Sequence, residues 1–266
     1  MLTDQLEVAP GRVNVESLKA SDGADPAKLT GGYFLELDGF GASEPLFFYT
    51  PQKNMTVVVK YPKDDDYAAP QFNYIKDYVG NKAETALFGG NFTDPAQGWR
   101  SYFDSKTWTD YYIINEFTGN SDAWWSTNIY KHRNDSLLYF GPVWDFDIAF
   151  NNDLRLGDAT RKLMATDAHD PRQWIQQFML DPGFKADIKT RWNAKKAELK
   201  ALVSYVDQLA AKINLSQQAN FMRWDIHTQT LGHGGPPPSS YAQGITQLKN
   251  YLNARYNYLE EIFSTW

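Results

Sequence analysis

The chain contains no cysteine among its 266 residues, and this absence excludes several kinds of site. Without cysteine there is no disulfide, no zinc–thiolate centre and no thiol nucleophile. Long apolar runs are missing as well, because no stretch approaches the roughly 20 residues that a helix needs to cross a bilayer. The printed sequence shows no signal-peptide pattern. Since Met1 is followed at once by residues typical of a domain interior, we expect the chain to begin after some strands of its domain.

An excess of positive charge is also missing. Lys and Arg number 26 against 32 Asp and Glu, which gives a net charge of −6 and a pI of about 5.2. Nucleic-acid-binding proteins usually carry a basic face and a high pI, so we expect no nucleic-acid partner. Hydrophobic residues make up 42% of the chain, enough for a substantial core in one large domain or two lobes. We expect a monomer that does not span a membrane.

Hydrophobic periodicity predicts strands first and helices afterwards. In residues 31–38, Tyr33, Leu35 and Leu37 alternate with Phe34, Glu36 and Asp38, as in a strand with two different faces. Further strands are predicted at 45–49 and 55–61. Helices are predicted at 69–87, at 105–117 after a cap at Asp104 or Ser105, over most of 171–224, and at 241–263. This order predicts an α+β fold.

The most informative stretch covers residues 120–152. It predicts a loop with Asp122 and Asn128, a hairpin turning at 133–136, and an apolar strand with Asp145 and Asp147 on one face. Because a hairpin brings its two ends together, we expect Asp122, Asn128 and Asp145 to meet. Buried carboxylates on such a strand would need a partner or a metal.

These residue types suit metal-dependent phosphoryl transfer. One acidic residue orients or deprotonates a hydroxyl, while an Asn and a second Asp hold magnesium on the phosphates of a nucleotide. Lys60, at the end of a predicted strand, is the candidate phosphate ligand. Purely structural roles stay open for each of these residues. Asp122 would then be a turn residue, Asn128 an edge-strand amide and Lys60 an ordinary strand-end lysine, and Asp145 and Asp147 would form ion pairs.

Four stretches, at 4–15, 29–38, 120–130 and 143–150, resemble the CotH-like (spore coat protein H) family of atypical secreted protein kinases. The resemblance implies a single kinase-like domain over 1–266, with a mainly helical C-lobe. Residues 1–68 would be the remnant of a β-rich nucleotide lobe, and residues 69–266 would hold the catalytic segment and the helical C-lobe.

The resemblance also implies an activity: magnesium-dependent transfer of the γ-phosphoryl group of ATP to Ser or Thr of a protein. ATP and Mg²⁺ or Mn²⁺ would be the cofactors, a bacterial coat or surface protein the acceptor, and the spore coat, the cell surface or the secreted fraction the location. Asp122 would be the catalytic base or hydroxyl-orienting residue. Asp145, Asp147 and Asn128 would hold the metal, and Lys60 with Asn128 the nucleotide.

Two rival functions stay open. In the first, the Asp145-Phe146-Asp147 motif binds the metal of a nucleotide sugar in a glycosyltransferase-like enzyme. In the second, the chain is a non-catalytic surface module that binds carbohydrate through exposed tryptophans, although we expect most aromatic residues, including Trp124-Trp125, to lie in the core. Metal-dependent binding of ATP separates the kinase interpretation from both rivals.

Overall fold

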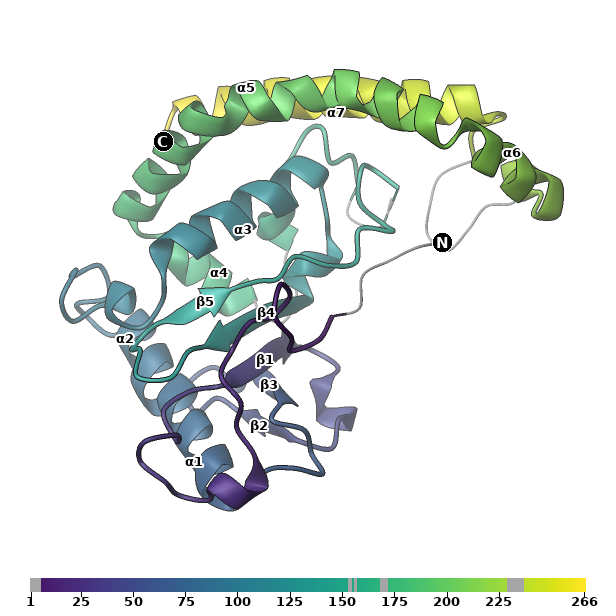
Figure 1. Cartoon of the computed structure of the whole chain (residues 1–266). Coiled ribbons are helices and arrows are strands. Elements are labelled where there is room, and N and C mark those ends of the chain that lie inside the picture. Colours follow the sequence, from purple (N-terminus) through teal and green to yellow (C-terminus); the bar gives the residue numbers. More distant parts are fainter. Residues whose placement is uncertain (1–5, 153–154, 156, 168–171, 229–236) are drawn as a thin grey trace.

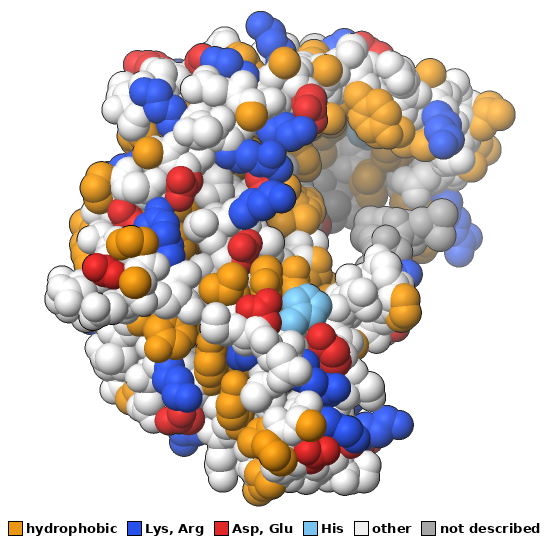
Figure 2. Space-filling view, turned by 60° about the vertical axis from the view of Figure 1, so that its left-hand side comes forward, with side chains coloured by type: hydrophobic (Ala, Val, Ile, Leu, Met, Phe, Trp, Pro, Cys, Tyr) orange, Lys and Arg blue, Asp and Glu red, His pale blue; other side chains and the backbone are white. Residues whose placement is uncertain are grey.

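One antiparallel sheet and a set of helices form the fold, seen in a computed structural model that describes residues 6–152, 155, 157–167, 172–228 and 237–266. Figure 1 shows the sheet in the lower half of the molecule, with two long helices arching over the top. In the space-filling view the molecule is hollowed between this arch and the sheet-bearing part, and acidic and basic side chains are interspersed (Figure 2). The α+β class predicted from the sequence is confirmed.

The sheet has five strands in the order β2-β3-β1-β4-β5, and each neighbouring pair is antiparallel. The strands are β1 Tyr33–Asp38, β2 Phe47–Tyr49, β3 Thr56–Tyr61, β4 Ser126–Lys131 and β5 Leu138–Phe140. The predicted hairpin is therefore present as β4 and β5. Central β1 places Glu36 directly opposite Asn128 of β4, which joins the early strands to the hairpin region.

The described helices are α1 Ala69–Asp77, α2 Thr85–Phe88, α3 Ser105–Thr118, α4 Arg172–Phe178, α5 Pro182–Lys212, α6 Asn214–Arg223 and α7 Tyr241–Ser264. A π-helical turn joins α1 to α2, so the predicted helix at 69–87 is nearly continuous. Both predicted ends of α3 are found: the Asp104 side chain accepts from the Thr107 amide, and Gly119 adopts a left-handed conformation. No helix in the described part of the chain is long and apolar enough to span a membrane.

Aromatic packing holds the hairpin against the helices. Trp108 of α3 is fully buried, and its ring stacks on Phe140 of β5 at 4.2 Å and on Phe184 of α5 at 5.6 Å. Such rings bury large apolar areas and prefer these offset arrangements. The end of β5 is thereby fixed relative to α3, and the chain leaves β5 from a rigid position.

The prediction of a strand that carries Asp145 and Asp147 is wrong. Residues 141–146 have no regular structure, Asp145 has a φ of +53°, and Asp145 and Asp147 are both exposed. The segment forms no strand ladder; the Asn120 side chain instead donates to the backbone carbonyls of Trp144 and Asp145. Alternating apolar residues imitate the strand pattern here, but these carbonyls bond to a side chain.

Candidate active site

Three carboxylates meet at the hairpin: those of Asp122, Asp145 and Asp147. One oxygen from each lies within 4.8 Å of the others. Asp122 begins a short 3-10 turn, Asp122–Trp124, just before β4, whereas the other two follow β5. Because β4 pairs with β5, the two ends of the hairpin come together, as the sequence predicts. This group, Asp122, Asp145 and Asp147, is called the acidic cluster below.

Crowding of negative charge marks the acidic cluster. The pKa of Asp145 is raised, first by partial burial, then by the charge and hydrogen bond of Asp147, and then by the charge of Asp122. Arg155 brings a positive charge near the cluster, with its Nη2 3.7 Å from Asp122 Oδ1. Carboxylate oxygens are the ligands that Mg²⁺ prefers, and a divalent cation would relieve the mutual repulsion. The residues present therefore fit a metal of this kind.

Two buried asparagines bond to the backbone of the segment that leads from β5 to Asp145. Asn128 Nδ2 donates to the carbonyl of Pro142 at 3.4 Å, and Asn120 Nδ2 donates to the carbonyl of Asp145 at 3.2 Å. The Oδ1 atoms of both side chains are buried and have no hydrogen-bond partner among the described residues. Leaving a buried acceptor unpaired costs about 1–3 kcal/mol, so such atoms call for an explanation. A free carbonyl oxygen at Asn128 suits the predicted role at a metal or nucleotide.

Lys60 forms an ion pair within the sheet. Its Nζ lies 3.1 Å from Oε2 of Glu36, while the other carboxylate oxygen of Glu36 accepts from the Ser126 hydroxyl. In the strand register, Glu36 of β1 lies opposite Asn128 of β4 and, on its other neighbour, opposite Val58 of β3. Lys60 lies two residues after Val58 and therefore points to the same face of the sheet. Lys60, Glu36 and Asn128 therefore share one face of the sheet. That face leads along β4 toward Asp122.

Comparison with known protein families decides the affiliation. Residues 14–259 match the model of the CotH kinase protein family. The chain belongs to the CotH kinase family. The predicted resemblance is thereby confirmed over most of the sequence. No curated protein and no solved structure matches the chain.

Two polar residues of this candidate site were not predicted from the sequence. Glu36 is 5% exposed and forms an ion pair with Lys60; the sequence signal was an acidic residue in the middle of a mostly apolar strand. Asn120 fixes the backbone of Asp145, and its position at the start of the loop gave no hint of this. Both contacts, Glu36 with Lys60 and Asn120 with Asp145, join segments that are far apart in the sequence.

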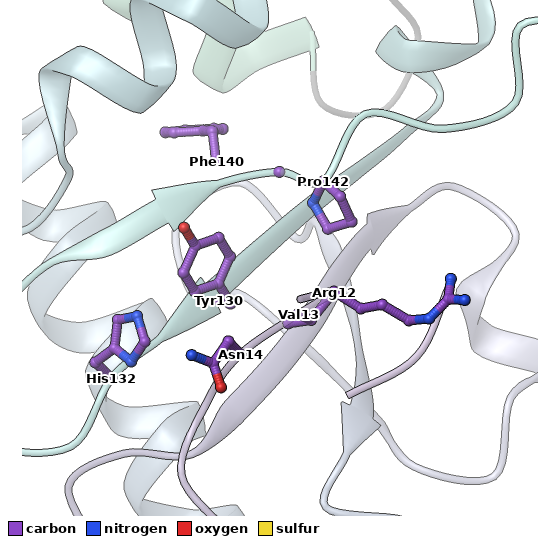
Figure 3. A pocket seen from close by; sticks show the side chains of 8 residues that line it. Arg12, Val13, Asn14, Tyr130, His132, Phe140 and Pro142 are labelled. Carbon is purple, nitrogen blue, oxygen red and sulfur yellow. The ribbon is translucent and has the colours of Figure 1, made fainter. Parts of the chain in front are cut away.

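A cavity of about 280 Å³ lies next to the hairpin, and neither Glu36 nor Asn120 lines it. Figure 3 shows Tyr130 of β4 and His132, which follows the strand, on one side and the segment with Arg12, Val13 and Asn14 on the other. None of the predicted site residues lines this cavity. Of those residues, the structure gathers Asp122, Asp145 and Asp147 in one cluster, and places Asn128 and Lys60 on one face of the sheet.

Proposed function

We propose that this member of the CotH kinase family transfers the γ-phosphoryl group of ATP to a Ser or Thr hydroxyl of a protein. The observation that carries the proposal is the approach of Asp122, Asp145 and Asp147 to within 4.8 Å. Phosphoryl transfer depends mainly on positioning and on compensating charge, and acidic side chains supply both through a metal. Family membership supports the same reaction class.

Asp145, Asp147 and Asn128 are the residues that would hold Mg²⁺ or Mn²⁺. When bound, the cation would neutralise charge on the phosphates of ATP. Asn120 holds the carbonyl of Asp145, so the carboxylate is presented from a fixed backbone. The buried Oδ1 of Asn128, which has no hydrogen-bond partner among the described residues, would supply a neutral oxygen ligand.

Lys60 and Asp122 would act on the two substrates. Lys60 would place a positive charge on the phosphates of ATP, and the buried Glu36 would fix the direction of its side chain. Asp122 would accept or orient the hydroxyl hydrogen of the acceptor, because it precedes β4 and approaches the cluster from the other end of the hairpin. A bacterial coat or surface protein remains the proposed acceptor.

The sheet topology favours the kinase function over that of a glycosyltransferase. Nucleotide-sugar enzymes of the expected type use alternating βαβ units and hence parallel strands. Each neighbouring pair in the five-stranded sheet of this chain is antiparallel.

Asp122→Ala should reduce phosphate transfer about 10²–10⁴-fold while ATP affinity changes little. Asp122 is proposed to touch the acceptor hydroxyl, so its contribution arises chiefly in the transition state. Asn128→Ala should weaken metal-dependent ATP binding as well. Transfer of radiolabelled phosphate to dephosphorylated casein, with ATP affinity measured in parallel, tests both variants.

Asp65→Ala is the matched control for this experiment, because Asp65 is exposed in a turn far along the chain from the cluster. It should behave like the unaltered chain. Unchanged transfer in Asp122→Ala would remove Asp122 from the mechanism. ATP-independent binding of sugar without any transfer would favour the non-catalytic module.

A further inference from the structure

A groove of about 700 Å³ begins at the acidic cluster and runs along α7. One wall is the segment that follows the cluster, and the other is α7 from Gly244 to Ala254. Figure 1 shows this teal segment passing beneath the arch formed by α5 and α7. Its volume lies within the range of about 300–1,000 Å³ usual for ligand sites.

Asp147 links this groove to the proposed reaction centre. It belongs to the acidic cluster and also lines the groove. Two other cavities, one beside Tyr130 and one beside Trp266, include no member of the cluster in their linings. A ligand lying in the groove along α7 would therefore reach the place where the phosphoryl group is proposed to be transferred.

The two substrates can then occupy different sides of the cluster. Lys60, Glu36 and Asn128 lie on the sheet, whereas no residue of the five strands lines the groove. Phosphoryl transfer needs the attacking and leaving oxygens roughly in line across the transferred group. With ATP on the sheet side, the groove along α7 is left for the acceptor.

Amide side chains on α7 identify the kind of acceptor. Gln247 and Asn250 line the groove, are exposed, and have no side-chain hydrogen bond to other residues in the described part of the chain. They lie three residues apart on one helix and therefore on the same side of it. Each amide offers a donor and an acceptor, the same pair that a peptide bond presents. Phe150 and Leu248 add apolar surface for side chains between them.

We propose that the groove binds the acceptor polypeptide in an extended conformation, with Gln247 and Asn250 hydrogen-bonded to its main chain. This inference rests on the proposed kinase function and adds the place where the acceptor binds. It makes α7 part of the substrate site. Gln247 and Asn250 are binding residues in this assignment and take no part in the chemical step.

The double variant Gln247→Ala/Asn250→Ala should raise the KM for dephosphorylated casein about tenfold, with kcat and the KM for ATP unchanged. Asn253→Ala is the matched control: Asn253 lies on the same helix, is exposed, and donates to the Lys249 carbonyl outside the groove. An unchanged KM for casein in the double variant, or an equal rise in the control, would overturn the proposal.

A crosslinking experiment gives an answer that does not depend on turnover. Because the chain has no cysteine, Asn250→Cys and Asn253→Cys each introduce a single attachment point for a maleimide-linked benzophenone. Irradiation with dephosphorylated casein should give a crosslink from position 250 and little from position 253. No crosslink from 250, or equal crosslinks from both, contradicts the groove. Failure of Mg²⁺-dependent ATP binding instead contradicts the kinase function, so the two failures are distinguishable.

Discussion

Asp145 combines two unfavourable features in one residue. Its φ of +53° is rare for a residue with a side chain, and its pKa is raised by partial burial and by the nearby Asp147 and Asp122. Backbone strain and like charges gathered in one place are typical of functional sites. The Asn120 side chain donates to the carbonyl of Asp145 and thereby holds this conformation in place.

Lys131 shows how the hairpin keeps its shape. Its side chain is fully buried, and Nζ donates to the carbonyls of Thr30 at 2.6 Å and His132 at 3.3 Å, and to that of Asp135. The Tyr78 ring also faces the ammonium group, 4.6 Å away. One side chain thus ties the turn of the hairpin to the residues before β1.

Burial lowers the pKa of Lys131 to about 8, and this has a consequence for stability at high pH. Above that pH the folded chain loses the proton while the unfolded chain, with a pKa near 10.4, keeps it. The unfolded state then binds more protons than the folded state, so the free energy of unfolding rises with pH between about 8 and 10. Below pH 8 both states are protonated and the contribution is constant.

Urea unfolding of the unaltered chain and of Lys131→Met, at pH 7.5 and at pH 9.5, tests this sign. The free energy of unfolding of the unaltered chain, relative to the variant, should increase by about 1–3 kcal/mol at the higher pH. Taking the difference removes the titration of the tyrosines that both proteins share. A relative decrease at pH 9.5 would show that the carbonyl hydrogen bonds keep Lys131 charged.

At the scale of elements, local signals predicted the ends of α3 and the hairpin. Asp104 and Gly119 bound α3 as their capping chemistry predicts, and a polar turn joins β4 to β5. The segment with Asp145 was not predictable in the same way. Its apolar alternation is a local feature, whereas the Asn120 side chain that bonds to its carbonyls comes from an earlier loop.

Gly119→Ala should lower the free energy of unfolding by about 1–3 kcal/mol. Gly119 has a φ of +63°, and an added Cβ would lie 2.5 Å from the Tyr251 hydroxyl and 2.9 Å from the Ala159 Cβ. The control is Gly90→Ala, because a Cβ at that position meets nothing within 4 Å. Chemical unfolding of both variants measures the difference. Equal stability of the two would mean that α3 does not need its left-handed end.

For the whole molecule, the decisive contacts join residues far apart in the sequence. Periodicity located most strands and helices, but it could not pair β1 with β4 or place Glu36 opposite Asn128. The α7 groove likewise arises only when the C-terminal helix packs beside the segment after β5. Candidate residues within the hairpin were therefore predictable, and those contributed by other elements were not.

Arg255 of α7 anchors this packing. It is fully buried with Glu116 of α3, 2.6 Å away, and also donates to the carbonyls of Ala159 and Lys162. Glu116 accepts in turn from the backbone amides of Met164 and Ala165. One ion pair thus connects α3, α7 and the chain between Ala159 and Ala165.

Arg255→Met should cost about 3–5 kcal/mol of stability, because it leaves the buried Glu116 carboxylate without its cation. The double variant Arg255→Met/Glu116→Met should lose less than the sum of the two single variants. Chemical unfolding of all four proteins completes this cycle. Strictly additive losses would show that the two side chains do not stabilise each other.

The central claim is that the acidic cluster binds ATP through a divalent cation. Calorimetric titration of ATP into the whole chain, with and without MgCl₂, tests it most directly. We expect heat of binding that requires magnesium, that is lost in Asp145→Asn, and that is unchanged in the exposed control Asp65→Asn. Equal magnesium-dependent binding by Asp145→Asn and the unaltered chain, or no binding of ATP by either, would contradict the account.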